Sequence, residues 1–109
     1  MIKNSIVLVP FPFDDFSTIK VRPALCLTSE IGIHRHVIIA FISSKTHNNL
    51  ENSEIIINEN SETGLIKDSI IKLHKVVSVP RSLIKRKLGV LNKETQKVVN
   101  EKLKLLFEL

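Results

Sequence analysis

Short runs of β-branched and aliphatic residues, separated by turn residues, recur along the first 91 residues and predict a small, mainly β protein. In chain order the runs are Ile6–Val9, Ala24–Thr28, Val37–Ile42, Glu54–Ile57, Ile70–Val77 and Gly89–Leu91. Each has the length and composition of a strand. The third run is apolar on both faces, so we expect it to lie in the centre of the sheet.

The last stretch of the chain changes to a helical period. Apolar residues from Val98 to Leu106 recur at three- and four-residue spacing, and Asn92 can cap a helix over residues 93–107. Pro80 is placed to start a helical turn within residues 80–87. Five or six strands and one terminal helix predict a strongly bent sheet or a partly open barrel, with the helix over one opening.

Length, cysteine content and hydropathy limit the kind of protein. The 109 residues have the length of one domain, and no linker divides residues 1–109. The lone cysteine, Cys26, excludes an intrachain disulfide and lies in an apolar run, where we expect it to be buried. No stretch resembles a membrane span or a signal peptide. We therefore expect a cytoplasmic protein that does not associate with a membrane.

The basic residues are concentrated in the second part of the chain. The net charge is +5, whereas residues 65–109 hold 11 basic and 4 acidic side chains. Such an excess suits a polyanionic partner, and it suits a solvated surface equally well. The same two interpretations apply to Lys85-Arg86-Lys87, for which a solvated turn is the commoner one.

Arg22 and the Lys72/His74 pair are the residues best suited to phosphate chemistry. Because Arg22 precedes Pro23, its backbone is restricted to extended conformations, which can aim the guanidinium group at a phosphate. Lys72 and His74 share one face of an alternating strand, where a cation and an imidazole can serve as charge stabiliser and acid–base group. A surface arginine and a solvated strand face would look the same, so these residues alone leave the function open.

Several kinds of site are excluded. Three scattered glycines cannot form a glycine-rich phosphate loop, and one cysteine cannot form a Cys–His zinc site. His34 and His36 have no third ligand at a suitable spacing, so we expect no metal site and no cofactor. With five Phe and no Trp or Tyr, base stacking is limited.

The most unusual string is Val9-Pro10-Phe11-Pro12-Phe13-Asp14-Asp15. Each proline fixes its own φ and pushes its predecessor into extended geometry. We therefore expect the first strand to leave its sheet here.

Two parts of the chain together resemble the MazF/PemK toxins, which have the CcdB-like fold. The specific part runs from Ile6 to Leu27 and contains Val9-Pro10-Phe11-Pro12-Phe13-Asp14, Lys20 and Arg22-Pro23-Ala24-Leu25. The later part is similar mainly in order, with Thr63-Gly64-Leu65, Asp68-Ser69, Lys87-Leu88-Gly89 and a closing helix. The resemblance covers nearly the whole chain.

The resemblance implies an SH3-like, partly open β-barrel with a C-terminal helix, usually a homodimer. It also implies a metal-independent endoribonuclease that cleaves single-stranded RNA at short sequences. In that chemistry the ribose 2′-hydroxyl attacks the adjacent phosphate and leaves a cyclic phosphate and a 5′-hydroxyl. A small acidic antitoxin would neutralise the enzyme.

The resemblance further implies the roles of particular residues. The family arginine before proline corresponds to Arg22, which would stabilise the phosphorane. The family Thr or Ser at the end of the third strand corresponds to Ser43, or to Ser44 if the alignment shifts by one. One family branch, the plasmid-borne Kid/PemK type, has an Arg-x-Asp pair where this chain has Lys72 and His74. This departure makes His74 the candidate general base and would equally fit a loss of activity.

The other residues assigned by the resemblance would contact the RNA. Beside Ser44 and Lys72 they are Asp14, Phe16, Lys20 and Lys45.

Two other functions stay open at this point. The first is a non-catalytic SH3-like module that binds RNA or a protein, which the departure at Lys72 and His74 keeps open. The second is a gyrase-poisoning toxin on the same fold. It ranks lower because that class relies on C-terminal aromatic contacts, whereas this helix ends in Leu105-Leu106-Phe107 without Trp.

Overall fold

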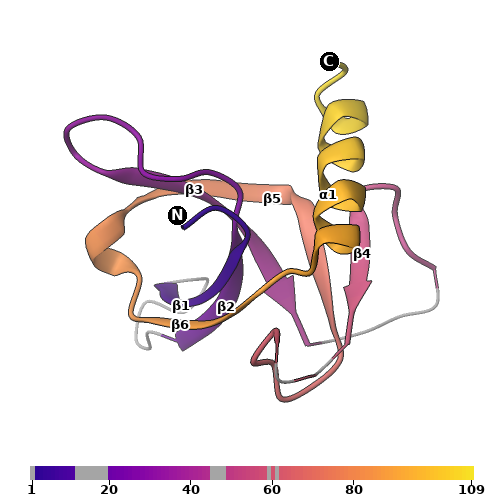
Figure 1. The fold of residues 1–109 in the computed structure, drawn as a ribbon, viewed down its shortest axis with the longest axis horizontal. Helices are drawn as coiled ribbons and strands as arrows, with labels where there is room; N and C mark the ends of the chain where they lie inside the picture. Colours follow the sequence, from indigo (N-terminus) through magenta and orange to yellow (C-terminus); the bar gives the residue numbers. More distant parts are fainter. Residues whose placement is uncertain (1, 12–19, 45–48, 59, 61) are drawn as a thin grey trace.

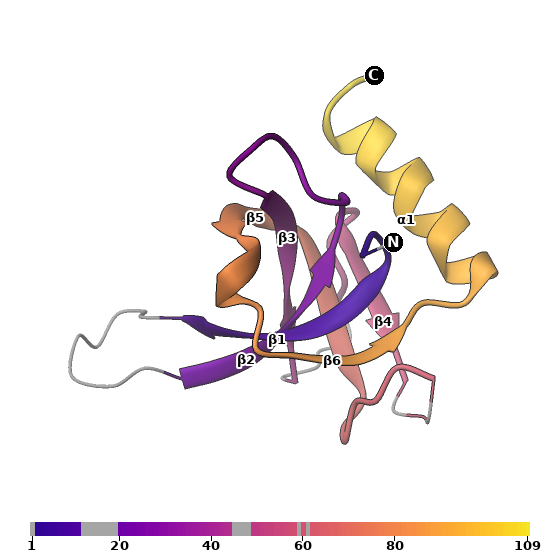
Figure 2. The ribbon, with the colours of Figure 1, turned by 60° about the vertical axis from the view of Figure 1, so that its left-hand side comes forward.

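The fold is a six-stranded antiparallel sheet that curls into a half-barrel, with one C-terminal helix beside it (Figures 1 and 2). The computed structural model describes residues 2–11, 20–44, 49–58, 60 and 62–109. Its elements are β1 (Ser5–Phe11), β2 (Lys20–Cys26), β3 (His36–Ser43), β4 (Glu54–Ile57), β5 (Ser69–Pro80), the 3₁₀ turn η1 (Arg81–Leu83), β6 (Arg86–Val90) and α1 (Lys93–Leu106). The strands lie in the order β4-β5-β3-β2-β1-β6. The predicted fold class is confirmed, and β3 is an interior strand as expected.

The predicted helix and its cap are also confirmed. The Asn92 side chain accepts a hydrogen bond of 2.8 Å from the Thr95 N–H, and α1 ends one residue before the predicted end. Pro80 immediately precedes η1, but the turn is short and β6 begins at Arg86. Among the described residues, no helix is long and apolar enough to cross a membrane.

The two faces of the central strands bury two separate hydrophobic clusters. One face, with Ile6, Leu25 and Ile71, packs against Val99 and Leu103 of α1. The opposite face, with Val7, Ala24 and Ile39, is covered by the end of β5 and by the turn that follows it. Because alternate residues of a strand point to opposite faces, this division tells which side chains share a surface.

A bulge in β5 produces much of the curl. Ala40 of β3 pairs with Val76, but the next residue, Phe41, pairs with Lys72. The three residues between them, 73–75, have no partner on β3, and such extra residues bend a strand. The sequence predicted one uninterrupted strand here.

The first strand ends within the proline string, at Phe11, two residues later than the predicted run Ile6–Val9. β1 stays paired with β2 through Phe11, which lies opposite Lys20. β6 pairs with β1 only up to Leu8, so Pro10 lies where β1 has lost that neighbour and no hydrogen bond needs its missing N–H. Pro23 is accommodated in the same way, because β3 pairs with β2 only from Ala24 onward. The segment that contains Pro12 and Phe13 lies outside the described residues.

Two glycines allow backbone to approach backbone where residues 62–64 cross β6. Gly64 has a φ of +70°, and a Cβ on it would overlap the Leu88 carbonyl oxygen. In return, a Cβ on Gly89 would overlap the Glu62 carbonyl oxygen. The Asn60 side chain closes the turn by accepting the N–H groups of Glu62 and Thr63 at 2.8 and 2.9 Å.

Cys26 is fully buried at the end of β2, as its apolar run predicts. Burial raises the pKa of its thiol from 9.0 to about 11, and the nearby charge of Arg81 offsets this only in part. At pH 8 the thiolate fraction is therefore about 100-fold lower than in an unfolded chain. We expect Ellman's reagent to label the native protein at least that much more slowly than the protein in guanidinium. Equal labelling rates would contradict the burial of this thiol.

Candidate active site

The strand register sets Arg22 and Ser43 on one face of the sheet. The last pair of β2 and β3 at this end is Ala24 with Phe41. Arg22 and Ser43 each lie two residues beyond that pair, so their side chains point to the same face as those of Ala24 and Phe41. The register of β2 and β3 thus places on one face two residues that were assigned from separate parts of the sequence.

The local backbone explains how these two residues are presented. Arg22 is exposed, and its extended backbone is restricted by Pro23 on one side and by pairing with Val9 of β1 on the other. Ser43 is half-buried, pairs with Ile70 of β5 and is the last residue of β3. Both residues stand just beyond the last paired residues of β2 and β3, at the end of the sheet where the two strands cease to be bonded.

Lys72 lies on the same face, one row away. It pairs with Phe41 on one side and with Glu54 of β4 on the other, and its Nζ is 3.8 Å from Glu54 Oε2. The Glu54 carboxylate is 4% exposed and also accepts the Glu51 N–H at 2.8 Å. A buried carboxylate is costly without such partners. The ion pair with Glu54 therefore holds the Lys72 side chain in place. Lys72 is the diagonal neighbour of Ser43, because Ser43 pairs with Ile70, and diagonal neighbours in a sheet lie about 7–8 Å apart.

His74 is placed elsewhere, within the β5 bulge. Its Nδ1 lies 2.7 Å from Ser53 Oγ. The ring lines a cavity of about 600 Å³, whose other walls include Lys102, Leu105 and Leu106 of α1. Along β5 it is four residues, or about 13 Å, beyond Ile70, which pairs with Ser43. The structure therefore groups His74 with the helix, and not beside Arg22 as the predicted single groove requires.

The remaining predicted RNA contacts divide into two groups. Lys20 is exposed at the start of β2, two residues from Arg22 and so on the same face, and Ser44 is exposed directly after Ser43. Asp14, Phe16 and Lys45 lie outside the described residues.

Sequence reasoning missed Glu54. The residue stands at the head of an apolar run of three isoleucines and was assigned to a strand without a role. Its significance depends on the register of β4 against β5, which pairs it with Lys72. A buried acid beside a lysine 18 positions later leaves no local pattern in a sequence.

Comparisons with known proteins identify the family of the chain. The family model described as "PemK-like, MazF-like toxin of type II toxin-antitoxin system" matches residues 3–107. No curated protein sequence matches the chain.

Solved structures share the fold at low sequence identity. A Mycobacterium tuberculosis toxin, MazF-mt6, is 20% identical and superposes with a TM-score of 0.75 over 96% of this chain and 97% of that one. An endoribonuclease in complex with its cognate antitoxin, from a mycobacterial species, is 10% identical with a TM-score of 0.74 over 100% and 96% of the two chains. The family match and the shared half-barrel lead to one conclusion: the chain belongs to the PemK-like, MazF-like toxins of type II toxin–antitoxin systems.

Proposed function

We propose that this toxin is a metal-independent endoribonuclease that cuts single-stranded RNA at short sequences, with Arg22 and Ser43 holding the phosphate at the cut. The observation that carries the proposal is that both residues lie on one face, two residues beyond the last pair of β2 and β3. Family membership supports it, because MazF-like toxins are endoribonucleases.

Arg22 and Ser43 fit the charge requirements of this reaction. The 2′-hydroxyl oxygen attacks the adjacent phosphorus, the bond to the 5′-oxygen breaks, and the products carry a 2′,3′-cyclic phosphate and a 5′-hydroxyl. Negative charge builds up on the non-bridging oxygens, and a guanidinium fork can donate to two of them at once. The Ser43 hydroxyl donates to a phosphate oxygen, and Lys72 adds positive charge one row away.

The proton of the 2′-hydroxyl needs an acceptor, for which we propose His74. In the tautomer whose Nδ1–H donates to Ser53 Oγ, this hydrogen bond orients the ring and leaves Nε2 to accept the proton. A general base must come within about 3 Å of the hydroxyl, or act through one water. Because His74 lies away from Arg22 in the register, its role as general base should be tested separately from the role of Arg22.

The proposed partners follow from the same family. We propose a small acidic antitoxin as the neutralising partner, a homodimer as the active form and the cytoplasm as its location. One structural neighbour was solved in complex with its cognate antitoxin, which supports the first of these.

The direct test is to incubate the purified protein with a mixed-sequence RNA in EDTA and to map the new ends. We expect cuts that recur at one short sequence and that disappear in the Arg22→Ala variant. The position of His74, within the β5 bulge and bonded to Ser53, favours one other function, a non-catalytic RNA-binding module, because it takes the proposed base away from Arg22. Salt-sensitive RNA binding without cut ends would establish that function instead.

A further inference from the structure

A second basic surface lines a cleft of about 500 Å³ near η1, and neither Arg22 nor Ser43 is among its lining residues. η1 and α1 lie on opposite sides of the molecule in both views (Figures 1 and 2). Five basic residues line the cleft, together with one acidic residue. They are Arg35, Arg81, Lys85, Arg86 and Lys87, with Glu30. We call these six residues the basic cleft.

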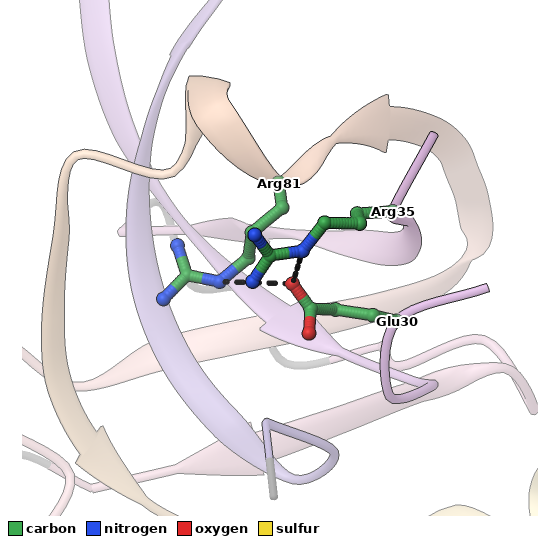
Figure 3. Close-up of polar contacts among 3 residues, drawn as sticks. All are labelled: Glu30, Arg35 and Arg81. Atoms are coloured by element: carbon green, nitrogen blue, oxygen red, sulfur yellow. Dashed lines mark hydrogen bonds and ion pairs between the residues drawn. The ribbon is translucent and has the colours of Figure 1, made fainter. Parts of the chain in front are cut away.

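Glu30 fixes the two arginines of the basic cleft. Its Oε1 lies 2.8 Å from the Nε of Arg35 and 3.9 Å from the Nε of Arg81, and Figure 3 shows both side chains reaching this one oxygen. The backbone is tied as well, because the Arg81 N–H donates to the Arg35 carbonyl oxygen at 2.8 Å. Two segments more than 40 residues apart are thus held together at one point.

The ion pairs leave the terminal nitrogens of both guanidinium groups available. Both pairs use the Nε edge, and within the described part of the chain neither guanidinium makes another hydrogen bond or ion pair. The terminal edge presents two parallel N–H donors, which match the oxygens of a phosphate. Holding the Nε edge in advance reduces the side-chain entropy lost when an anion binds.

Charge and packing together favour a nucleic acid over a peptide. Five cations face one carboxylate, so the basic cleft attracts an anion of several charges. Its apolar walls, Ile2, Val7 and Ile84, already pack in the hydrophobic cluster behind it. The cleft therefore offers charge and few exposed apolar anchors, whereas peptide interfaces depend on such anchors. Nucleic acid binding depends mainly on phosphate contacts.

We propose that the basic cleft binds backbone phosphates of single-stranded RNA away from the cut. The inference rests on the proposed function, in which RNA is the substrate. β1 relates the two sites, because Val7 lines the cleft and Val9, two residues further along the strand, pairs with Arg22. Both valines are buried, so an RNA strand that occupies both sites passes around the hydrophobic cluster that contains them. Phosphate contacts at the cleft increase affinity without reading bases.

The test compares a triple variant of the cleft with a triple variant of equal charge on the helix. Lys85→Gln, Arg86→Gln and Lys87→Gln neutralise one side of the basic cleft. The control neutralises three exposed lysines of α1 that do not line it, namely Lys93, Lys97 and Lys104. The probe is a fluorescent 20-nucleotide 2′-O-methyl RNA, which cannot be cut, in a salt titration of its anisotropy.

We expect the cleft variant to bind the probe at least 10-fold more weakly in low salt. The slope of log affinity against log salt should fall by about 2, because each lost phosphate contact removes about 0.7. The helix control should keep the slope of the parent. Lys85→Glu alone repeats the test if the triple variant does not fold, since this residue precedes β6.

Further arms separate this proposal from its alternatives. RNA affinity and slope equal to the parent's would overturn it. The proposal would also be overturned if the cleft variant bound RNA like the parent but no longer bound a polyglutamate peptide, since the cleft would then bind an acidic protein segment. Cleavage of a six-nucleotide RNA should be unchanged while cleavage of a long RNA slows. A parent that binds RNA through the cleft but never cuts it would refute the proposed ribonuclease and leave the cleft standing.

Discussion

Arg22→Ala is expected to lower the rate of RNA cleavage by about 10²–10³-fold, because it removes the donor fork placed to stabilise the phosphorane. Loss of one such donor costs about 3–4 kcal/mol of transition-state stabilisation in comparable sites. The side chain is exposed, so the unfolding temperature should hardly change. Single-turnover cleavage with enzyme in excess, together with thermal unfolding followed by circular dichroism, measures both.

Three further variants determine how specific that loss is. Arg22→Lys keeps the charge but not the fork, so we expect it to recover only part of the rate. Ser43→Ala should slow cleavage less than Arg22→Ala, because it removes one neutral donor. His74→Ala should cost about 10²-fold or more if His74 is the base, whereas a histidine that only lines the cavity beside α1 leaves the rate near that of the parent. Unchanged cleavage by Arg22→Ala would remove the basis for the proposed site.

Gly64→Ala is expected to destabilise the protein by about 3 kcal/mol or more. A left-handed φ costs a residue with a Cβ about 1–2 kcal/mol, and overlap with a backbone oxygen adds about 1–3 kcal/mol. The overlapping oxygen belongs to Leu88 of β6, which lies between Lys87 and Gly89, and both of these neighbours pair with β1. For a domain of this size the unfolding temperature should fall by roughly 12 °C or more. Urea unfolding gives the change in free energy directly.

Gly32→Ala is the matched control for this prediction. Gly32 has nearly the same φ, +71°, but no atom lies within 4 Å of the position of its added Cβ. It should therefore show only the conformational cost of about 1–2 kcal/mol. Equal losses in the two variants would mean that residues 62–64 do not pack tightly against β6.

Local pattern was enough to predict the elements of this fold. The bounds predicted for β4 agree with the structure residue for residue. The Asn92 cap could be predicted from the sequence because a side-chain oxygen directly before a helical period is a local signal. The strand ends were predicted less well at the prolines. Whether β1 can continue through Pro10 depends on where β6 stops pairing with β1, and β6 lies about 75 residues later in the sequence.

The residues of the candidate site likewise divide into those whose placement follows from a local pattern and those whose placement does not. Arg22 and Ser43 were assigned from a resemblance, and the register of β2 and β3 sets both on one face of the sheet, which strand alternation makes easy to anticipate. His74 was assigned to the same groove because alternation puts it on the face of Lys72. The bulge at residues 73–75 interrupts that regularity and turns His74 toward Ser53 and α1. The basic cleft combines residues 30 and 35 with residues 81 and 85–87, and no local sequence pattern predicts that these two segments lie together.

The most direct measurement uses a synthetic RNA that carries the cleaved sequence, with a single 2′-deoxy nucleotide on the 5′ side of the cut. The account predicts that the protein in EDTA cuts the all-ribose RNA into a 2′,3′-cyclic phosphate and a 5′-hydroxyl end. It should leave the substituted RNA intact, because the attacking oxygen is missing. Cleavage of the substituted RNA, or products that carry a 5′-phosphate, would contradict attack by the 2′-hydroxyl at a phosphate held by Arg22 and Ser43.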